Sequence, residues 1–168
     1  MEQQKKKILI IEDDPSFLNM LYEKLTDEGY YVVMASETEG AKDWAMRADS
    51  KKVDMIISDQ RMPNEEGTSF LSFLTELEKV EPEKMDRKSG TFQKIRERFS
   101  KYNDGEFFNF LKNIKARPCI RVILSGYAVD SEIKKGLASG IIHKFISKES
   151  DPSEILAIIR KLFEEHQA

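Results

Sequence analysis

The chain has 168 residues, of which 40% are hydrophobic and 34% are charged, and its formal net charge is −3. This composition is that of a folded globular domain, so it excludes a disordered chain, and the small net charge gives no reason to expect a nucleic acid as partner. Hydrophobic runs reach only strand length, which excludes a membrane-spanning helix. The one cysteine, Cys119, excludes an internal disulfide and is typical of a cytoplasmic protein.

Short hydrophobic runs alternate along the chain with segments of helical periodicity. The runs predict five strands, at residues 7–11, 31–35, 53–58, 119–125 and 141–147. The helical patterns that follow them begin at Pro15, Thr38, Phe70, Asp130 and Pro152. A helix after each strand predicts a doubly wound α/β fold, because neighbouring parallel strands need crossover connections. The first and third strands then lie at the centre of the sheet, where the winding reverses.

One long segment interrupts this alternation. Between Phe73 and Pro118 lie 44 residues, where a return from helix to strand needs only about a dozen. The segment has two stretches of hydrophobic residues at helical spacing, 92–102 and 107–114, with the turn sequence Asn103-Asp104-Gly105 between them. We therefore predict one domain over residues 1–168, with a helical hairpin inserted at 77–116.

The position and charge of this insertion leave its role open. A segment that follows a helix starts at the amino edge of the sheet, so we expect it far from the carboxyl ends of the strands, and we expect deletion of 81–107 to leave a site there intact. Residues 81–117 carry ten Lys or Arg and six Asp or Glu. The insertion is either a solvated hairpin whose phenylalanines cover the third helix or the end of the sheet, or a surface for a partner or a second copy. Contact with nucleic acid or anionic lipid is the least favoured reading, because the charges are mixed in sign.

Polar residues follow four of the predicted strands at the point where each strand ends. Glu12 and Asp13 follow the first strand, Asp59 the third, Ser125 the fourth and Lys148 the fifth. Each alone is a common cap, turn or surface residue, but the carboxyl ends of parallel strands meet at one edge. Carboxylates without histidine or cysteine companions suit Mg²⁺. An aspartate beside such a cation can accept a phosphoryl group as a nucleophile, with a lysine and a hydroxyl contacting the phosphate.

Four segments in this order resemble the motifs of bacterial two-component response regulator receiver domains (CheY-like). They are residues 8–15, 54–63 with Gly67, 122–128 and 140–148. The resemblance covers the chain except for about 77–116. It implies a flavodoxin-like, five-stranded parallel sheet of order 2-1-3-4-5.

The resemblance also implies a role for each residue at the strand ends. Asp59 is the phosphoacceptor, and Mg²⁺ is bound by Glu12, Asp13, Asp59 and the backbone carbonyl of Arg61. Lys148 binds the phosphate. Ser125 is the hydroxyl that moves toward it, and Phe145 is the aromatic residue that turns inward with Ser125, although Phe145 is equally well explained as a core residue.

The partners implied by the resemblance are a histidine kinase or phosphotransfer protein and a downstream protein or output domain, all in the cytoplasm. A homodimer stays open, and neither a membrane nor a nucleic acid is expected to bind this chain. The protein would not be an enzyme beyond self-phosphorylation and autodephosphorylation. A phosphoaspartyl hydrolase of the haloacid dehalogenase type needs an aspartate where Arg61 stands. The alternative is a degenerate receiver that binds partners without phosphorylation.

One position departs from the family's pattern near the site. Glu149 stands after Lys148, where the family usually has a proline in a cis peptide. Because a cis bond before any other residue costs about 2.5–4 kcal/mol, we expect a trans bond or a strained one. A trans bond could misplace Lys148, and Glu149 adds negative charge near the phosphate.

Overall fold

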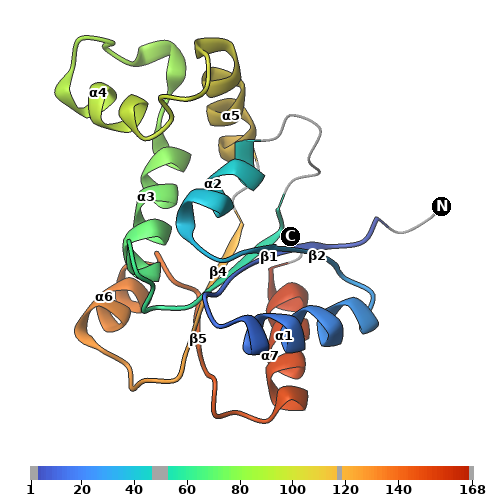
Figure 1. Cartoon of the computed structure of the whole chain (residues 1–168). Helices are drawn as coiled ribbons and strands as arrows, with labels where there is room; N and C mark the ends of the chain where they lie inside the picture. The colour runs from blue at the N-terminus through green and yellow to red at the C-terminus, as the bar shows by residue number, and fades with distance from the viewer. Residues whose placement is uncertain (1–3, 47–52, 117–118, 167–168) are drawn as a thin grey trace.

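A five-stranded parallel sheet forms the centre of the molecule, as the computed structural model shows for residues 4–46, 53–116 and 119–166 (Figure 1). The strand order is β2-β1-β3-β4-β5. The strands are β1 (Lys7–Ile11), β2 (Tyr31–Ala35), β3 (Met55–Ser58), β4 (Ile120–Ser125) and β5 (Lys144–Ser147). This order confirms the predicted doubly wound, flavodoxin-like fold. In the described part of the chain, no helix is long and apolar enough to cross a membrane.

Helices cover both faces of the sheet and divide the core into two parts. The five that return the chain from strand to strand or close it are α1 (Pro15–Asp27), α2 (Thr38–Met46), α3 (Gly67–Lys79), α6 (Ser131–Ser139) and α7 (Pro152–Glu165). Alternate residues of β1 point to opposite faces: Ile8 and Ile10 pack with α1 and α7, and Leu9 and Ile11 pack on the side of α2, α3 and α6. The sequence pattern predicts that the second helix continues to about residue 48, and residues 47 and 48 lie outside the described residues.

The long segment between α3 and β4 forms a short 3-10 turn (Pro82–Lys84) and two helices, α4 (Gly90–Glu97) and α5 (Asp104–Ala116). Helix α5 packs against α2 and α3, and α4 lies beyond the C-terminal end of α3 (Figure 1). Their inward residues belong to the same core as α3 and the sheet; they are Phe92, Ile95, Phe99, Phe107, Phe110 and Leu111. The phenylalanines therefore cover the third helix, one of the arrangements expected from the sequence.

Polar contacts fasten these helices to each other and to α2. Lys42 of α2 is buried, donates to the main-chain oxygen of Arg98 and lies 5.4 Å from the ring centre of Phe99. Arg96 donates to the main-chain oxygens of Phe99 and Tyr102, each at 2.7 Å. Because Lys42 and Arg96 satisfy carbonyls at the end of α4 and in the connection that follows, they set the direction in which the chain turns toward α5.

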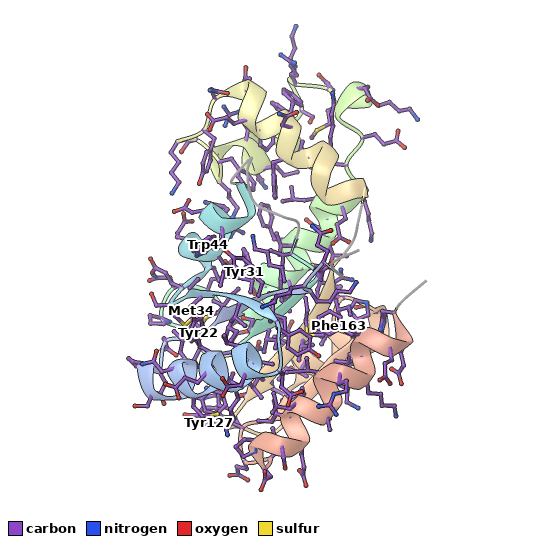
Figure 2. All side chains as sticks on the ribbon, turned by 90° about the vertical axis from the view of Figure 1, so that its right-hand side faces the viewer. Tyr22, Tyr31, Met34, Trp44, Tyr127 and Phe163 are labelled. Atoms are coloured by element: carbon purple, nitrogen blue, oxygen red, sulfur yellow. The ribbon has the colours of Figure 1, made fainter. Side chains whose placement is uncertain are left out.

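The outer edge of the sheet is closed by α2. Trp44 donates from its ring nitrogen to the main-chain oxygen of Met34 on β2, at 3.1 Å. The ammonium of Lys7 lies 5.6 Å from the Tyr31 ring centre and 5.8 Å from the Trp44 ring centre. Figure 2 shows Tyr31, Met34 and Trp44 close together. The edge strand β2 is thus held to the end of α2 by side chains as well as by its pairing with β1.

Candidate functional site at the carboxyl edge of the sheet

The carboxyl ends of β1, β3, β4 and β5 bring the predicted residues to one edge. Ile11 is paired with Ser58, so the next residues, Glu12 and Asp59, lie side by side. The N–H of Asp59 donates to the Ile11 oxygen at 2.9 Å, which fixes this arrangement. On the other side, Ser125 is paired with the last residue of β5, directly before Lys148.

Three carboxylates form the acidic centre of the site. Glu12 and Asp59 are buried, with 2% and 7% of their surface exposed, and Asp13 is exposed. One oxygen from each of the three lies within 4.8 Å of the others. Oxygen donors of this charge suit a hard cation such as Mg²⁺, which shares its shell between carboxylates and water. The donor set therefore fits the predicted metal.

Lys148 joins two of these carboxylates. Its Nζ is 2.6 Å from Glu12 Oε2 and 3.2 Å from Asp59 Oδ2. Burial lowers the pKa of Lys148, but the hydrogen bonds and charges of Glu12 and Asp59 outweigh burial and raise it. Burial raises the pKa of Glu12 to about 7, although its hydrogen bond to Lys148 acts in the opposite direction. A charged lysine thus faces the predicted phosphoacceptor.

The turn after β5 places Lys148 without a cis peptide, since every described peptide bond is trans. The Lys148 N–H donates to the Ser125 oxygen at 2.9 Å, and the Ser150 N–H donates to the Ser147 oxygen at 3.1 Å. Glu149 is exposed, and its N–H donates to Ser147 Oγ at 3.2 Å. The trans bond does not keep Lys148 from the site, because these hydrogen bonds hold the turn and the ammonium reaches both carboxylates.

The remaining predicted residues lie around this centre. Ser125 is buried, and its Oγ accepts a hydrogen bond from the Tyr127 N–H at 3.2 Å. Tyr127 is 59% exposed, lies on the outer surface in Figure 2, and stacks against the guanidinium of Arg61 at 4.2 Å. Phe145 is partly buried and packs on the core under α3 and α6. Its position agrees with a core residue and leaves the switch role untested.

Gln60 is a site residue that the sequence reasoning missed. It is buried, and its N–H donates to Asp59 Oδ1 at 2.8 Å. Its side-chain amide accepts from the Thr68 N–H at 2.9 Å and donates to Thr68 Oγ1 at 3.0 Å and Asp130 Oδ2 at 3.4 Å. Asp130 in turn caps α6 through the Ile133 N–H at 2.8 Å. Gln60 therefore links the phosphoacceptor loop to the first turns of α3 and α6.

One residue of the insertion, Arg98, contacts a loop at this edge, although the insertion was expected to lie far from it. Glu65 belongs to the loop that joins β3 to α3. Each of its carboxylate oxygens is 2.9 Å from Arg98 NH2. Arg98, which directly follows α4, therefore contacts the loop that follows Asp59, because the chain after α4 packs on α3 through Phe99 and Phe73.

The comparisons with known proteins agree with this geometry. Residues 8–84 match the family model of the response regulator receiver domain. The transcriptional regulatory proteins GlrR of Escherichia coli (strain K12) and QseF of Escherichia coli O157:H7 are each 37% identical to this chain over 83 residues. That match covers 49% of this chain, and the chain spans only 17% of the length of either relative.

Solved structures extend the similarity in fold along the chain. A CheY-like receiver domain protein from Methanospirillum hungatei JF-1 has a TM-score of 0.62 and 21% identity, covering 96% of each chain. TrrA of Thermotoga maritima, solved in complex with Mg²⁺ and BeF, has a TM-score of 0.55 and 20% identity, covering 94% of this chain and 98% of that one. Residues 8–84 match the receiver domain of response regulators, the phosphorylation-controlled proteins of two-component signalling. The sheet order agrees with that match, since the chain has the fold of solved CheY-like receiver domains.

Proposed function

We propose that the chain is a phosphoacceptor receiver in which Asp59 takes a phosphoryl group from a histidine kinase or phosphotransfer protein. The observation that carries this proposal is the position of Lys148, whose Nζ lies 3.2 Å from Asp59 Oδ2 inside an acidic, largely buried site. Structural ion pairs also bury lysines, but here the pair lies at the carboxyl edge where doubly wound sheets bind ligands. A cytoplasmic location and a downstream protein or output domain belong to the same proposal.

The residues that would hold Mg²⁺ are Glu12, Asp13, Asp59 and the backbone carbonyl of Arg61. When bound, the metal offsets the negative charge that gathers on the transferring phosphoryl group. The likeness to a receiver solved with Mg²⁺ and BeF supports this choice of metal for a site of three clustered carboxylates. Before the metal binds, Lys148 stabilises the charge of Glu12 and Asp59.

In the proposed step, one Asp59 oxygen attacks phosphorus while the bond from phosphorus to the donor nitrogen breaks. The electron pair of that bond stays on the nitrogen, and a protonated donor imidazole leaves as neutral imidazole. Gln60 orients the Asp59 carboxylate through its N–H, 2.8 Å from Oδ1. Lys148 would bind a phosphate oxygen as a point charge, and the Ser125 hydroxyl would donate to another.

Phosphorylation would change the state of the domain and would not be a step in the conversion of a substrate. The chain would therefore have no enzymatic role beyond self-phosphorylation and autodephosphorylation. Ser125 moving toward the phosphate would leave its Tyr127 N–H partner, and Phe145 would turn inward behind it. A receiver that works without phosphorylation is the competing function, and the experiment below separates the two.

The test is incubation of the protein with a small acyl phosphate and Mg²⁺, followed by intact-mass measurement and a phosphate-affinity gel. We expect wild type to gain one phosphoryl group, and both Asp59→Asn and a sample treated with EDTA to gain none. No gain in wild type would favour the phosphorylation-independent receiver. An equal gain in Asp59→Asn would place the phosphate elsewhere.

A further inference from the structure

The loop between β3 and α3, residues 60–66, carries the proposed metal-binding carbonyl of Arg61 and is held at both its base and its outer side. At the base, the Gly67 N–H donates to the Gln60 oxygen at 2.9 Å. On the outer side, Asn64 donates to Glu37 at 3.1 Å in an exposed contact. Glu65 makes the second outer contact, with Arg98 of the inserted segment. The insertion is therefore one of the supports of the loop.

Arg98 is held at both its side chain and its main chain, which distinguishes this contact from an ordinary surface ion pair. Its guanidinium lies 3.9 Å from the ring centre of Phe73 on α3. Its main-chain oxygen is bonded by the buried ammonium of Lys42. The side chains of Arg98 and Glu65 are 33% and 17% exposed. Exposed pairs contribute little because they must order two mobile side chains, but a guanidinium already stacked in place has lost much of that mobility.

We propose that Arg98 is a positioning residue of the phosphoacceptor site, which acts through Glu65 on the loop that follows Asp59. This inference rests on the proposed function, since it concerns how the metal-binding loop is ordered. The insertion then helps to order the metal-binding loop without itself contacting the metal or the phosphoryl group. Because coupling between two sites is reciprocal, Mg²⁺ bound at the carboxylates would also tighten the packing of α4 on α3.

The chain offers a matched control for this proposal. Arg96 lies two residues before Arg98, in the last turn of α4, but its hydrogen bonds are with Phe99, Tyr102 and Asp104, all within the insertion. Arg98→Gln and Arg96→Gln therefore both weaken the inserted segment, and only the first removes the contact with Glu65. The exchanged pair, Arg98→Glu with Glu65→Arg, provides a rescue in which the charges are restored in the opposite sense.

The experiment measures amide hydrogen exchange of residues 60–67 without metal, and Mg²⁺ affinity by calorimetry, in the full chain. In Arg98→Gln we expect faster exchange in the loop and a Kd for Mg²⁺ raised about three- to tenfold, which is the range for loss of one partly buried ion pair. Arg96→Gln keeps the wild-type loop exchange and Kd even if it lowers the unfolding temperature equally. The exchanged pair, Arg98→Glu with Glu65→Arg, should recover part of the lost Mg²⁺ affinity and part of the lost protection from exchange.

Two results would overturn the proposal. One is wild-type loop exchange and Kd in Arg98→Gln, and the other is an equal change in Arg96→Gln, which would mean a general loosening of the insertion. If wild type itself binds no Mg²⁺, the proposed function fails. If wild type binds Mg²⁺ and Arg98→Gln binds it equally, only the role of Arg98 fails.

Discussion

Gly67 shows how closely a single residue is fitted to the site. A Cβ added there would lie 2.2 Å from the carbonyl oxygen of Asp59 and 2.9 Å from Ser58 Oγ. These atoms belong to the end of β3 and cannot move without moving the phosphoacceptor. The glycine that closes the phosphorylation motif therefore permits α3 to begin directly against the strand end, which also explains why α3 begins at Gly67, three residues before the predicted start.

We predict that Gly67→Ala lowers the free energy of unfolding by about 1–3 kcal/mol, the range for overpacking, and slows phosphorylation of Asp59. Urea unfolding and the phosphate-affinity gel measure the two effects. Gly40→Ala is the control, because Gly40 lies in α2 and a Cβ there meets only Ala35 Cβ of β2, at 3.5 Å, and alanine is favoured over glycine in a helix. Unchanged stability in Gly67→Ala would contradict the close approach.

His143 makes stability depend on pH. Its Nδ1 accepts a hydrogen bond from the Arg121 N–H at 2.9 Å, and burial, the Arg121 charge and His166 lower its pKa from 6.5 to about 4. Because the folded pKa lies below the unfolded one, the unfolded chain binds more protons between these values. The contribution of His143 is therefore complete above pH 6.5 and lost as the pH falls toward 4.

The lowering of the His143 pKa corresponds to about 3 kcal/mol in the free energy of unfolding, and the partial exposure of the ring reduces this to about 1–2 kcal/mol. We expect His143→Gln to lose less stability than wild type between pH 7 and pH 4.5, by about that amount, in urea unfolding. Parallel pH profiles for the two proteins would rule out the lowered pKa.

At the scale of elements, α4 and α5 are part of the main core. Phe99 is fully buried and contacts the rings of Phe73, Tyr102, Phe107 and Phe110. Deletion of 81–107 would remove Phe99 and Phe107 and expose the face of α3 that they cover. That deletion is therefore a poor test of the insertion's role, contrary to the expectation from sequence, and single substitutions are needed.

We predict that Phe99→Ala lowers the free energy of unfolding by about 3–5 kcal/mol, as expected for loss of a buried aromatic ring, in one cooperative transition. Phe108→Ala, at a partly buried position of α5, should cost less. Separate transitions for the insertion and the sheet, followed by tryptophan fluorescence and circular dichroism, would show that the insertion unfolds on its own.

At the scale of the molecule, the sheet and its covering helices could be predicted from the sequence, because their hydrophobic residues recur at regular spacing. The strand Lys7–Ile11 and the helix from Pro15 carry such patterns, and parallel winding then brings Glu12, Asp59 and Lys148 together. The contacts of Gln60 with Thr68 and Asp130 could not be predicted, because a single buried glutamine has no periodicity and its partners lie 8 and 70 residues away. Glu65 and Arg98 meet only because the chain after α4 packs on α3.

The acidic site should also connect metal binding to the stability of the whole domain. We predict that Mg²⁺ raises the unfolding temperature of wild type, since a ligand of the folded state stabilises by about 2.7 kcal/mol at one hundred times its Kd. Asp13→Asn should remove most of this gain. Asp14→Asn is the control, because Asp14 caps α1 through the Ser16 N–H at 2.9 Å and an asparagine can cap in the same way. Equal gains in all three proteins would place the metal elsewhere.

The helices α4 and α5 also occupy space beside α2 and α3 that other proteins could otherwise reach (Figure 1). The face of α3 that the insertion covers with its own phenylalanines is not accessible to another protein, whatever the charge of that protein. Proteins that approach over α1, α6 or α7 do not meet this obstacle. A protein that approaches from the side of the insertion therefore meets the outer surface of α4 and α5, and not the face of α3 that their phenylalanines cover.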